Sequence, residues 1–329
     1  MKYILIYIYI PITLFADLNS TSQDKNNYID QTHKTVSKKV INVSEELDTQ
    51  LSKLINTSNN KKSIDEFYQN KKFNEETDET FINIRTDAYF QSKEKAQYNA
   101  QISAQFPLVK SQKNLNIFIK DSRDEELNDL VNIQEIDTVT IIGLNYFAPI
   151  FYKIKSKYTL ATHGVEPLIQ AKYFMNFNLS SWKIEPIQTF TYSTQDRFEE
   201  ETNIYFDNKI DEKSLGRFVM RRKTKNKAKG MEYSFSFQYF YSPKENTSIS
   251  FSQSFLGNTA YEYNLNDTTT SVYNGIYNYT TSFIWRKNIY KKWLFSQIVP
   301  TLSFHKKYEY NPNYTLVVLF DFYFGKLKY

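Results

Sequence analysis

The 329-residue chain contains no cysteine and only seven glycines, and beyond its N-terminus it has no long apolar run. The absence of cysteine excludes disulfides, a thiol nucleophile, thiolate metal ligands and lipidation of an N-terminal cysteine. A membrane helix needs about 20 consecutive apolar residues. A helical membrane protein is therefore excluded after residue 16, in keeping with a mean hydropathy of -0.57.

Aromatic residues are abundant instead: they make up 17% of the chain, with 27 Tyr and 26 Phe but only three Trp. The charge is nearly balanced, because 41 basic residues face 36 acidic ones and leave a net charge of +5. The densest basic run, 221–227, is more typical of a polar loop tip than of a nucleic-acid patch. We therefore predict no nucleic-acid partner.

The N-terminus has the pattern of a signal peptide over residues 1–16. After Met1 and Lys2, a nearly continuous apolar run extends to Phe15, about the length of a signal-peptide h-region. The alternative is a hydrophobic helix that stays attached to the mature chain. Cleavage would leave residues 17–80 as a periplasmic extension that is partly disordered and partly helical.

Within this extension, residues 28–55 carry a narrow apolar stripe with helical spacing. Its members recur at steps of three and four residues: Val36, Val40, Val43, Leu47, Leu51 and Leu54. So narrow a stripe is typical of a single amphipathic helix that docks on another surface. We predict a helix over 28–55 that offers a docking site for a periplasmic protein partner. A second, short helix is expected at 64–68.

After residue 81 the apolar period changes from 3.6 to 2, which indicates strands. The candidate strands are 82–91, 97–106, 115–119, 136–148, 157–165, 168–177, 183–193, 201–207, 214–223, 231–242, 247–256, 274–286, 292–304 and 314–324. Many match the roughly 9–11 residues of a tilted transmembrane strand, and their apolar faces are rich in Tyr and Phe. We predict an all-β fold over 81–329, a transmembrane antiparallel up-and-down β-barrel of about 12–14 strands with a helical N-terminal extension. A secreted or periplasmic β-sandwich binding protein is the alternative.

An even strand number sorts the connections between strands by length. Longer polar connections then fall on the outer side of the membrane, at 122–135, 194–200, 258–273 and 305–313. The same parity places the N-terminal helix in the periplasm. Pro300 predicts a bulge or an end within the strand 292–304.

The last strand carries an unbroken apolar row, Leu316, Val318, Phe320, Phe322 and Phe324. It resembles the C-terminal closing strand of bacterial outer-membrane β-barrels. The resemblance implies that Phe320, Phe322 and Phe324 form an assembly signal read by the barrel-assembly machinery. Residues 325–329 follow this row, so either Phe324 or Tyr329 is the terminal aromatic.

A second resemblance covers the later half of the chain. The segment Trp-Leu-Phe-Ser-Gln-Ile-Val-Pro at 293–300 and the ending Phe-Tyr-Phe-Gly at 322–325 resemble an uncharacterised family of proteobacterial outer-membrane barrel proteins. This resemblance implies a fold and a location, the bacterial outer membrane with its surrounding lipid, without an activity.

Signals for catalysis are weak. His163 has Val165 at the position where an outer-membrane phospholipase places its serine nucleophile, and the other two histidines lie far apart in the sequence. No carboxylate cluster has metal-ligand spacing, and no glycine-rich phosphate loop is present. We predict no catalytic residue, metal site or cofactor, and keep a lipid hydrolase only as an alternative.

The polar faces of the candidate strands carry charges of both signs. With the apolar register facing lipid, the predicted lumen-lining residues are Arg85, Asp87, Lys120, Lys172, Arg217, Arg221, Glu232, Arg286 and Asp321. They can line a pore, or they can pair across the interior and close the barrel. We therefore expect either a passive, porin-like channel or a structural barrel with a polar lumen.

Overall fold

The computed structural model describes residues 28–52, 80–108, 114–121, 140–194, 197–244, 246–266, 269–291 and 293–325. The predicted signal peptide at 1–16 and the short helix at 64–68 lie outside these ranges. The predicted helical extension is confirmed as α1 (Tyr28–Ser52). No helix of the described ranges is long and apolar enough to cross a membrane.

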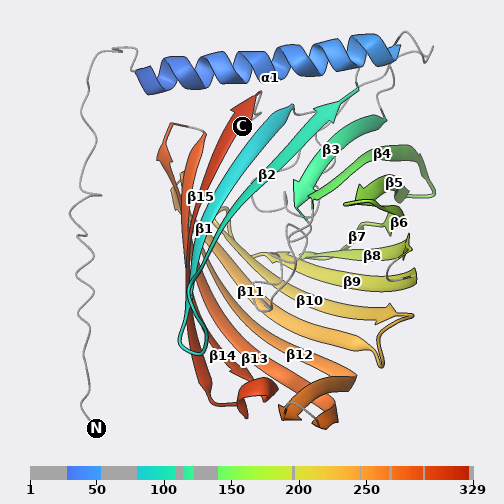
Figure 1. Ribbon diagram of the computed structural model, residues 1–329, viewed down its shortest axis with the longest axis vertical. Coiled ribbons are helices and arrows are strands. Elements are labelled where there is room, and N and C mark those ends of the chain that lie inside the picture. Colours follow the sequence, from blue (N-terminus) through green and yellow to red (C-terminus); the bar gives the residue numbers. More distant parts are fainter. Residues whose placement is uncertain are drawn as a thin grey trace.

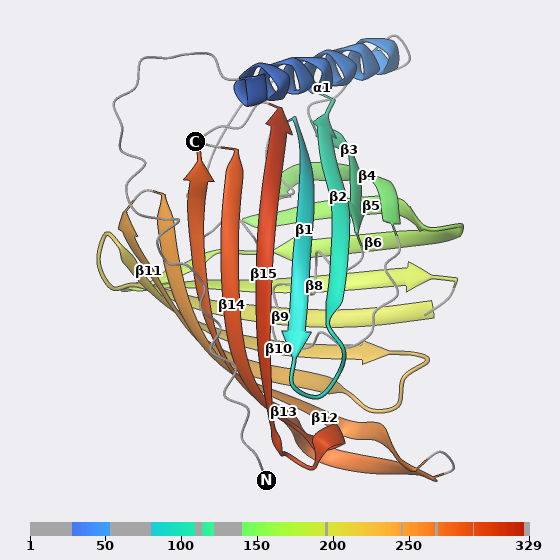
Figure 2. The same cartoon turned by 60° about the vertical axis from the view of Figure 1, so that its left-hand side comes forward.

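From residue 81 the described chain is almost entirely strand, and neighbours in sequence are neighbours in the sheet (Figure 1, Figure 2). The strands are β1 (Phe81–Gln91), β2 (Gln97–Pro107), β3 (Leu115–Asp121), β4 (Thr140–Phe151), β5 (Ile154–His163), β6 (Glu166–Phe174), β7 (Phe177–Leu179), β8 (Trp182–Ser193), β9 (Arg197–Lys209), β10 (Ser214–Lys225), β11 (Glu232–Lys244), β12 (Thr247–Asn266), β13 (Thr269–Tyr290), β14 (Leu294–His305) and β15 (Pro312–Gly325). A 3-10 turn, η4 (Lys306–Tyr308), joins the last two.

The sheet closes on itself. β1 pairs with β2 on one side and with β15 on the other, and β6 pairs with both β5 and β8. The short β7 continues the line of β6 along β8, so the two form one interrupted strand. The result is a closed antiparallel barrel of 14 strands, which confirms the predicted fold class.

Burial alternates along the strands. The wall of a closed sheet shields its inner face from solvent, so the less exposed residues of each strand point inward. On β11 and β12 these inward residues are small and polar, Ser234, Ser236, Ser248, Ser250 and Ser254. The intervening outward residues are large and apolar, and Phe237 is 55% exposed. This distribution is the reverse of that in a water-soluble sandwich, whose interior is apolar.

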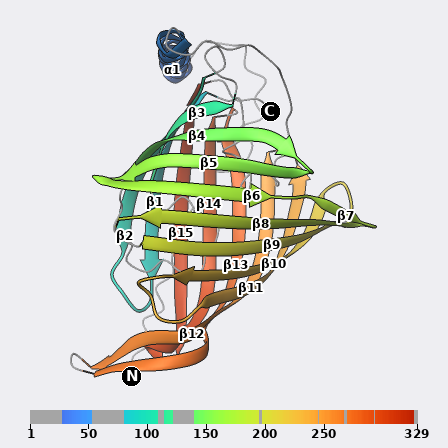
Figure 3. The same cartoon turned by 90° about the vertical axis from the view of Figure 1, so that its right-hand side faces the viewer.

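The predicted loop at 258–273 is wrong. Residues 258–266 and 269–273 instead extend β12 and β13 into a long hairpin, in which Tyr261 lies opposite Tyr273. Figure 3 shows the hairpin projecting at the end of the barrel opposite α1. The strands of this hairpin could not be predicted from its Asn- and Thr-rich sequence. A segment that extends beyond a bilayer needs no continuous apolar face, so the period of two is missing.

Several other strand boundaries also differ from the sequence prediction, and three of them change the interpretation of a segment. The expected strand 168–177 breaks after Phe174, and the chain resumes as β7. β9 begins at Arg197, inside the expected loop 194–200, and β10 continues to Lys225, so much of the basic run 221–227 is strand rather than loop tip.

Pro300 neither ends nor bulges its strand. β14 runs through it, with Pro300 paired to Leu316 of β15. On the other side, the pairs between β13 and β14 skip from Ser282–Thr301 to Trp285–Ile298. Proline has no N–H to donate, so its place beside a local gap in the ladder explains why it is tolerated within a strand.

Candidate functional site

The inner wall of the barrel holds three groups of charged side chains. The first lies at the closing seam, where Asp321 of β15 is fully buried. Arg85 of β1 donates from Nε to Asp321 Oδ1 at 2.8 Å. Arg286 of β13 reaches across β14 and places Nη1 3.1 Å from Asp321 Oδ2. Because β13 and β15 are not neighbours, this contact forms where side chains converge inside the curve of the sheet.

The second group is a ladder of ion pairs between β9 and β10. Arg217 donates two hydrogen bonds to Asp207, from Nε to Oδ1 at 2.7 Å and from Nη2 to Oδ2 at 3.1 Å. Both residues are buried. Two-point contacts of this kind are the strong form of an Arg–carboxylate pair. Further along, Arg221 lies 3.3 Å from Glu201, and Lys223 bridges Glu199 at 2.9 Å and Glu201 at 3.7 Å. The acidic and basic charges of this wall largely satisfy one another.

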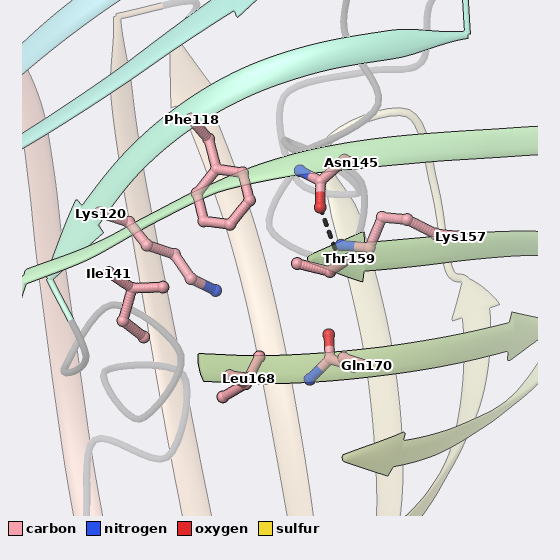
Figure 4. Close-up of a pocket in the computed structure, with 8 residues that line it drawn as sticks. All are labelled: Phe118, Lys120, Ile141, Asn145, Lys157, Thr159, Leu168 and Gln170. Atoms are coloured by element: carbon pink, nitrogen blue, oxygen red, sulfur yellow. Dashed lines mark hydrogen bonds between the residues drawn. The ribbon is translucent and has the colours of Figure 1, made fainter. Parts of the chain in front are cut away.

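The third group surrounds a small cavity on the wall formed by β3 to β6 (Figure 4). The cavity holds about 30 Å³, enough for one water or a small ion. Its lining is Phe118, Lys120, Ile141, Asn145, Lys157, Thr159, Leu168 and Gln170. Thr159 donates to Asn145 Oδ1 at 2.7 Å.

Lys172 adds a further positive charge beside this cavity. It stands directly opposite Lys157 across the β5–β6 pair. Like charges at directly opposed positions repel. We call Lys120, Lys157 and Lys172 the lysine wall.

The residues predicted from sequence divide among these groups. The seam brings Arg85, Arg286 and Asp321 together, and Arg217 and Arg221 belong to the ladder. Lys120 and Lys172 belong to the lysine wall.

Two predicted residues lie beside the groups. Asp87 accepts a 2.8 Å hydrogen bond from Asn99 on β2. Glu232 lies opposite Lys223 across β10 and β11.

Sequence reasoning missed the acidic partners in the ladder and one member of the lysine wall. Glu199 lay in a predicted loop, although Glu199, Glu201 and Asp207 share one strand face at even spacing, a signal that was available. Lys157 shares its face with Thr159, which also indicated an inward side chain. The pairings themselves could not be predicted, because they require the register between strands.

The aromatic row of the last strand lies on the outer face of the barrel and also contacts helix α1. Phe320, Phe322 and Phe324 alternate with the inward Asp321 on β15, so they face outward. Phe324 also stacks on the ring of His33 in α1, with a 5.1 Å separation between ring centroids. Their role as an assembly signal remains a prediction.

No catalytic constellation forms within the described ranges. His163 has no hydrogen bond there to a serine hydroxyl, the contact that a lipid hydrolase would need. The same ranges contain no group of three His, Asp or Glu residues that could hold a metal.

No family model and no curated protein matches the chain, so the resemblance to an uncharacterised proteobacterial family stays a prediction. Among solved structures, the anion-selective porin from Comamonas acidovorans is similar with 6% identity and a TM-score of 0.45, over 74% of this chain and 98% of that one.

Two further solved structures are also similar to this chain. OccK5 (OpdH) of Pseudomonas aeruginosa has 8% identity and a TM-score of 0.43, over 75% of this chain and 97% of that one. A KdgM porin in complex with disordered oligogalacturonate has 10% identity and a TM-score of 0.35, over 73% and 98%. The pairing of the strands and the burial of the inner wall define a closed antiparallel β-barrel with a polar interior.

Proposed function

We propose that the protein is a bacterial outer-membrane β-barrel that acts as a passive, porin-like channel with a polar lumen. The observation that carries this proposal is the reversed polarity of the closed sheet, polar and charged inside and apolar and aromatic outside. An outward face of this kind is stable against lipid tails, whereas in water it would expose a continuous hydrophobic surface. A soluble β-sandwich needs the opposite arrangement.

The inner wall supports passage of solutes rather than tight binding. Most of its charges are matched in the seam and the ladder, so a solute meets few unsatisfied charges that could trap it. The inward serines of β11 and β12 have short side chains, so they occupy little of the lumen on that side. The lysine wall places the amino-bearing side chains of Lys157 and Lys172 directly opposite each other, and we propose that it gives the lumen a modest preference for small anions.

Purified protein in a planar lipid bilayer tests the channel directly. We expect discrete conductance steps, and a well-folded barrel that inserts without conductance would overturn the channel in favour of a purely structural barrel. Cell fractionation with gel mobility before and after boiling tests the membrane assignment. A soluble protein whose mobility does not change on heating would support the sandwich alternative.

The ion preference has its own test. The reversal potential under a salt gradient should shift toward cations in the double variant Lys157→Gln, Lys172→Gln, because it removes two inward positive charges. Lys213→Gln, in the turn between β9 and β10, is the matched control and should shift it less. An unchanged reversal potential in the double variant would remove the lysine wall from the selectivity argument.

A further inference from the structure

Helix α1 lies across one end of the barrel, nearly perpendicular to the strands beneath it (Figure 1, Figure 2). Polar contacts fix its position. Asp30 accepts hydrogen bonds from Lys291 Nζ at 2.6 Å and from the Tyr290 hydroxyl at 3.1 Å, in and beside the turn that follows β13. Ser44 lies 3.2 Å from the hydroxyl of Thr80, just before β1. The helix is therefore attached at two points about four turns apart.

An aromatic contact joins the helix to the end of the closing strand. His33 Nε2 lies 2.7 Å from the backbone oxygen of Tyr323. The same ring stacks on Trp293, with centroids 4.3 Å apart and an angle of 14° between the planes. The helix thus rests on the strand ends at a defined height along the barrel.

The middle of the helix packs against the outside of the wall. Val40 is buried in one cluster with Ala104 and Phe106, and Ile82 and Phe324 pack against this cluster. Ile82 is opposite both Ala104 and Phe324 in the sheet and shares their outward side. In Figure 3 the helix is seen end-on over this wall rather than over the middle of the barrel.

Two lines of side chains run along the helix at seven-residue spacing, which keeps each line on one side. The line Asp30, Ser37 and Ser44 is polar and buried. It includes Asp30 and Ser44, which bond to the barrel rim, so it marks the side of the helix that faces the strand ends.

The second line precedes the first by one residue and consists of Ile29, Val36 and Val43. Val36 packs against the outer-wall cluster, which places this line on the side of the apolar wall. The barrel does not cover the two ends of this second line of side chains. Ile29 is 52% exposed and Val43 is 50% exposed. We call Ile29, Val36 and Val43 the apolar strip.

We propose that α1 is an interfacial helix, whose apolar strip is covered by the lipid leaflet around the barrel. This inference rests on the proposed membrane location. A helix that lies across the end of a membrane barrel runs along the bilayer surface, and its strip continues the apolar outer wall into the headgroup boundary. This is the placement that amphipathic helices adopt at membrane surfaces.

One exposed lysine indicates which headgroups the helix meets. Lys39 is exposed and borders the apolar strip, three residues after Val36 and four before Val43. Lys34 and Lys38 are also exposed, but they lie on the side of Gln31 and Glu45, away from the strip. Basic residues beside an interfacial helix are attracted to anionic lipid. We therefore assign the surroundings of Lys39 to anionic phospholipid headgroups.

The absence of cysteine allows single labels to test this placement. An environment-sensitive fluorophore is attached to Ile29→Cys or Val43→Cys, and to Gln31→Cys or Glu45→Cys as matched controls on the opposite side of the helix, two residues further along. The protein is reconstituted in vesicles of phosphatidylethanolamine and phosphatidylglycerol. We expect labels at 29 and 43 to be quenched by lipid-borne quenchers, and labels at 31 and 45 by aqueous iodide.

Equal access of iodide to all four labels would overturn the interfacial helix and leave the strip for a protein partner. A label on Phe237→Cys, on the outer face of β11, separates this result from failure of the proposed function. If the label at 237 is in lipid while those at 29 and 43 are in water, only the helix inference fails. If the label at 237 is also in water, the membrane proposal itself fails.

Vesicles of phosphatidylcholine alone test the headgroup assignment. We expect iodide to reach the label at 29 more readily in these vesicles, because Lys39 loses its anionic partners. Equal protection of residue 29 in both kinds of vesicle would overturn the assignment to anionic lipid.

Discussion

Arg85 and Asp321 face each other across the strand pair that closes the barrel, with 2.8 Å between Arg85 Nε and Asp321 Oδ1. They are 236 residues apart in the sequence, so this ion pair joins the first strand to the last. Asp321 has no exposed surface and also lies against Arg286. One carboxylate therefore compensates two guanidinium groups at the seam.

Replacing Asp321 with Asn should destabilise the barrel strongly. The substitution leaves two partly buried arginines close together without the buried counter-charge of Asp321. The loss of one partner of a buried pair costs about 3–5 kcal/mol. The measurement is the urea midpoint at which the folded band disappears on an unboiled gel. Asp87→Asn, which keeps a polar side chain beside Asn99, should cost much less. Equal midpoints for Asp321→Asn and the unmodified protein would contradict a role for this carboxylate in closure.

The sequence was sufficient to predict most of the barrel, because lipid outside and polar groups inside impose a period of two on every spanning strand. The Phe row of β15 and the Tyr and Phe face of β11 are direct examples. The same logic failed for the β12–β13 hairpin at 258–273, since its strands have no continuous apolar face. It also failed at Met175 and Asn176, where only pairing with β8 reveals an interrupted strand.

The candidate site was predictable as a set of faces but not as a set of contacts. Alternation indicates that Arg85, Arg286 and Asp321 point inward. It cannot reveal that they meet, because their proximity depends on closure between β1 and β15 and on the curvature across β14. The acidic half of the ladder was missed for a simpler reason, since Glu199 lies beyond the apolar part of its strand.

Gly143 should not tolerate a side chain. A Cβ at this position would lie 2.5 Å from the Cβ of Ala161 and 2.6 Å from the oxygen of Leu160, on the neighbouring β5. Gly143→Ala must push the strands apart, with an overpacking cost of about 1–3 kcal/mol. Gly216→Ala is the matched control, because its nearest neighbour, Ile210 Cδ1, would be 3.6 Å away. The same urea assay compares them, and equal loss of stability in the two variants would contradict this explanation.

Docking of the N-terminal part of α1 should weaken in acid. The hydrogen bond from Lys291 holds the pKa of Asp30 below its ordinary value of 3.8. A lowered carboxyl pKa stabilises the docked state above the ordinary value, and this stabilisation is lost as the pH falls through the docked-state pKa. A spin label on Thr32→Cys should therefore become more mobile below about pH 4.

Asp30→Asn is the control for this titration. The labelled variant should be more mobile already at neutral pH, because Asn cannot form the ion pair with Lys291, and it should lack the acid transition. An identical transition with and without the carboxylate would assign the effect to another group.

Assembly should depend on Phe324 and not on the four residues that follow Gly325. Phe324 faces outward at the end of β15, where it pairs with Ile82 and stacks on His33. Deletion of 326–329 should leave the yield of heat-modifiable barrel in membranes unchanged, whereas Phe324→Ala should lower it. His33→Ala separates the two roles of Phe324, because it removes only the contact with the helix and should leave assembly intact. A deletion that abolishes assembly while Phe324→Ala does not would transfer the terminal aromatic role to Tyr329.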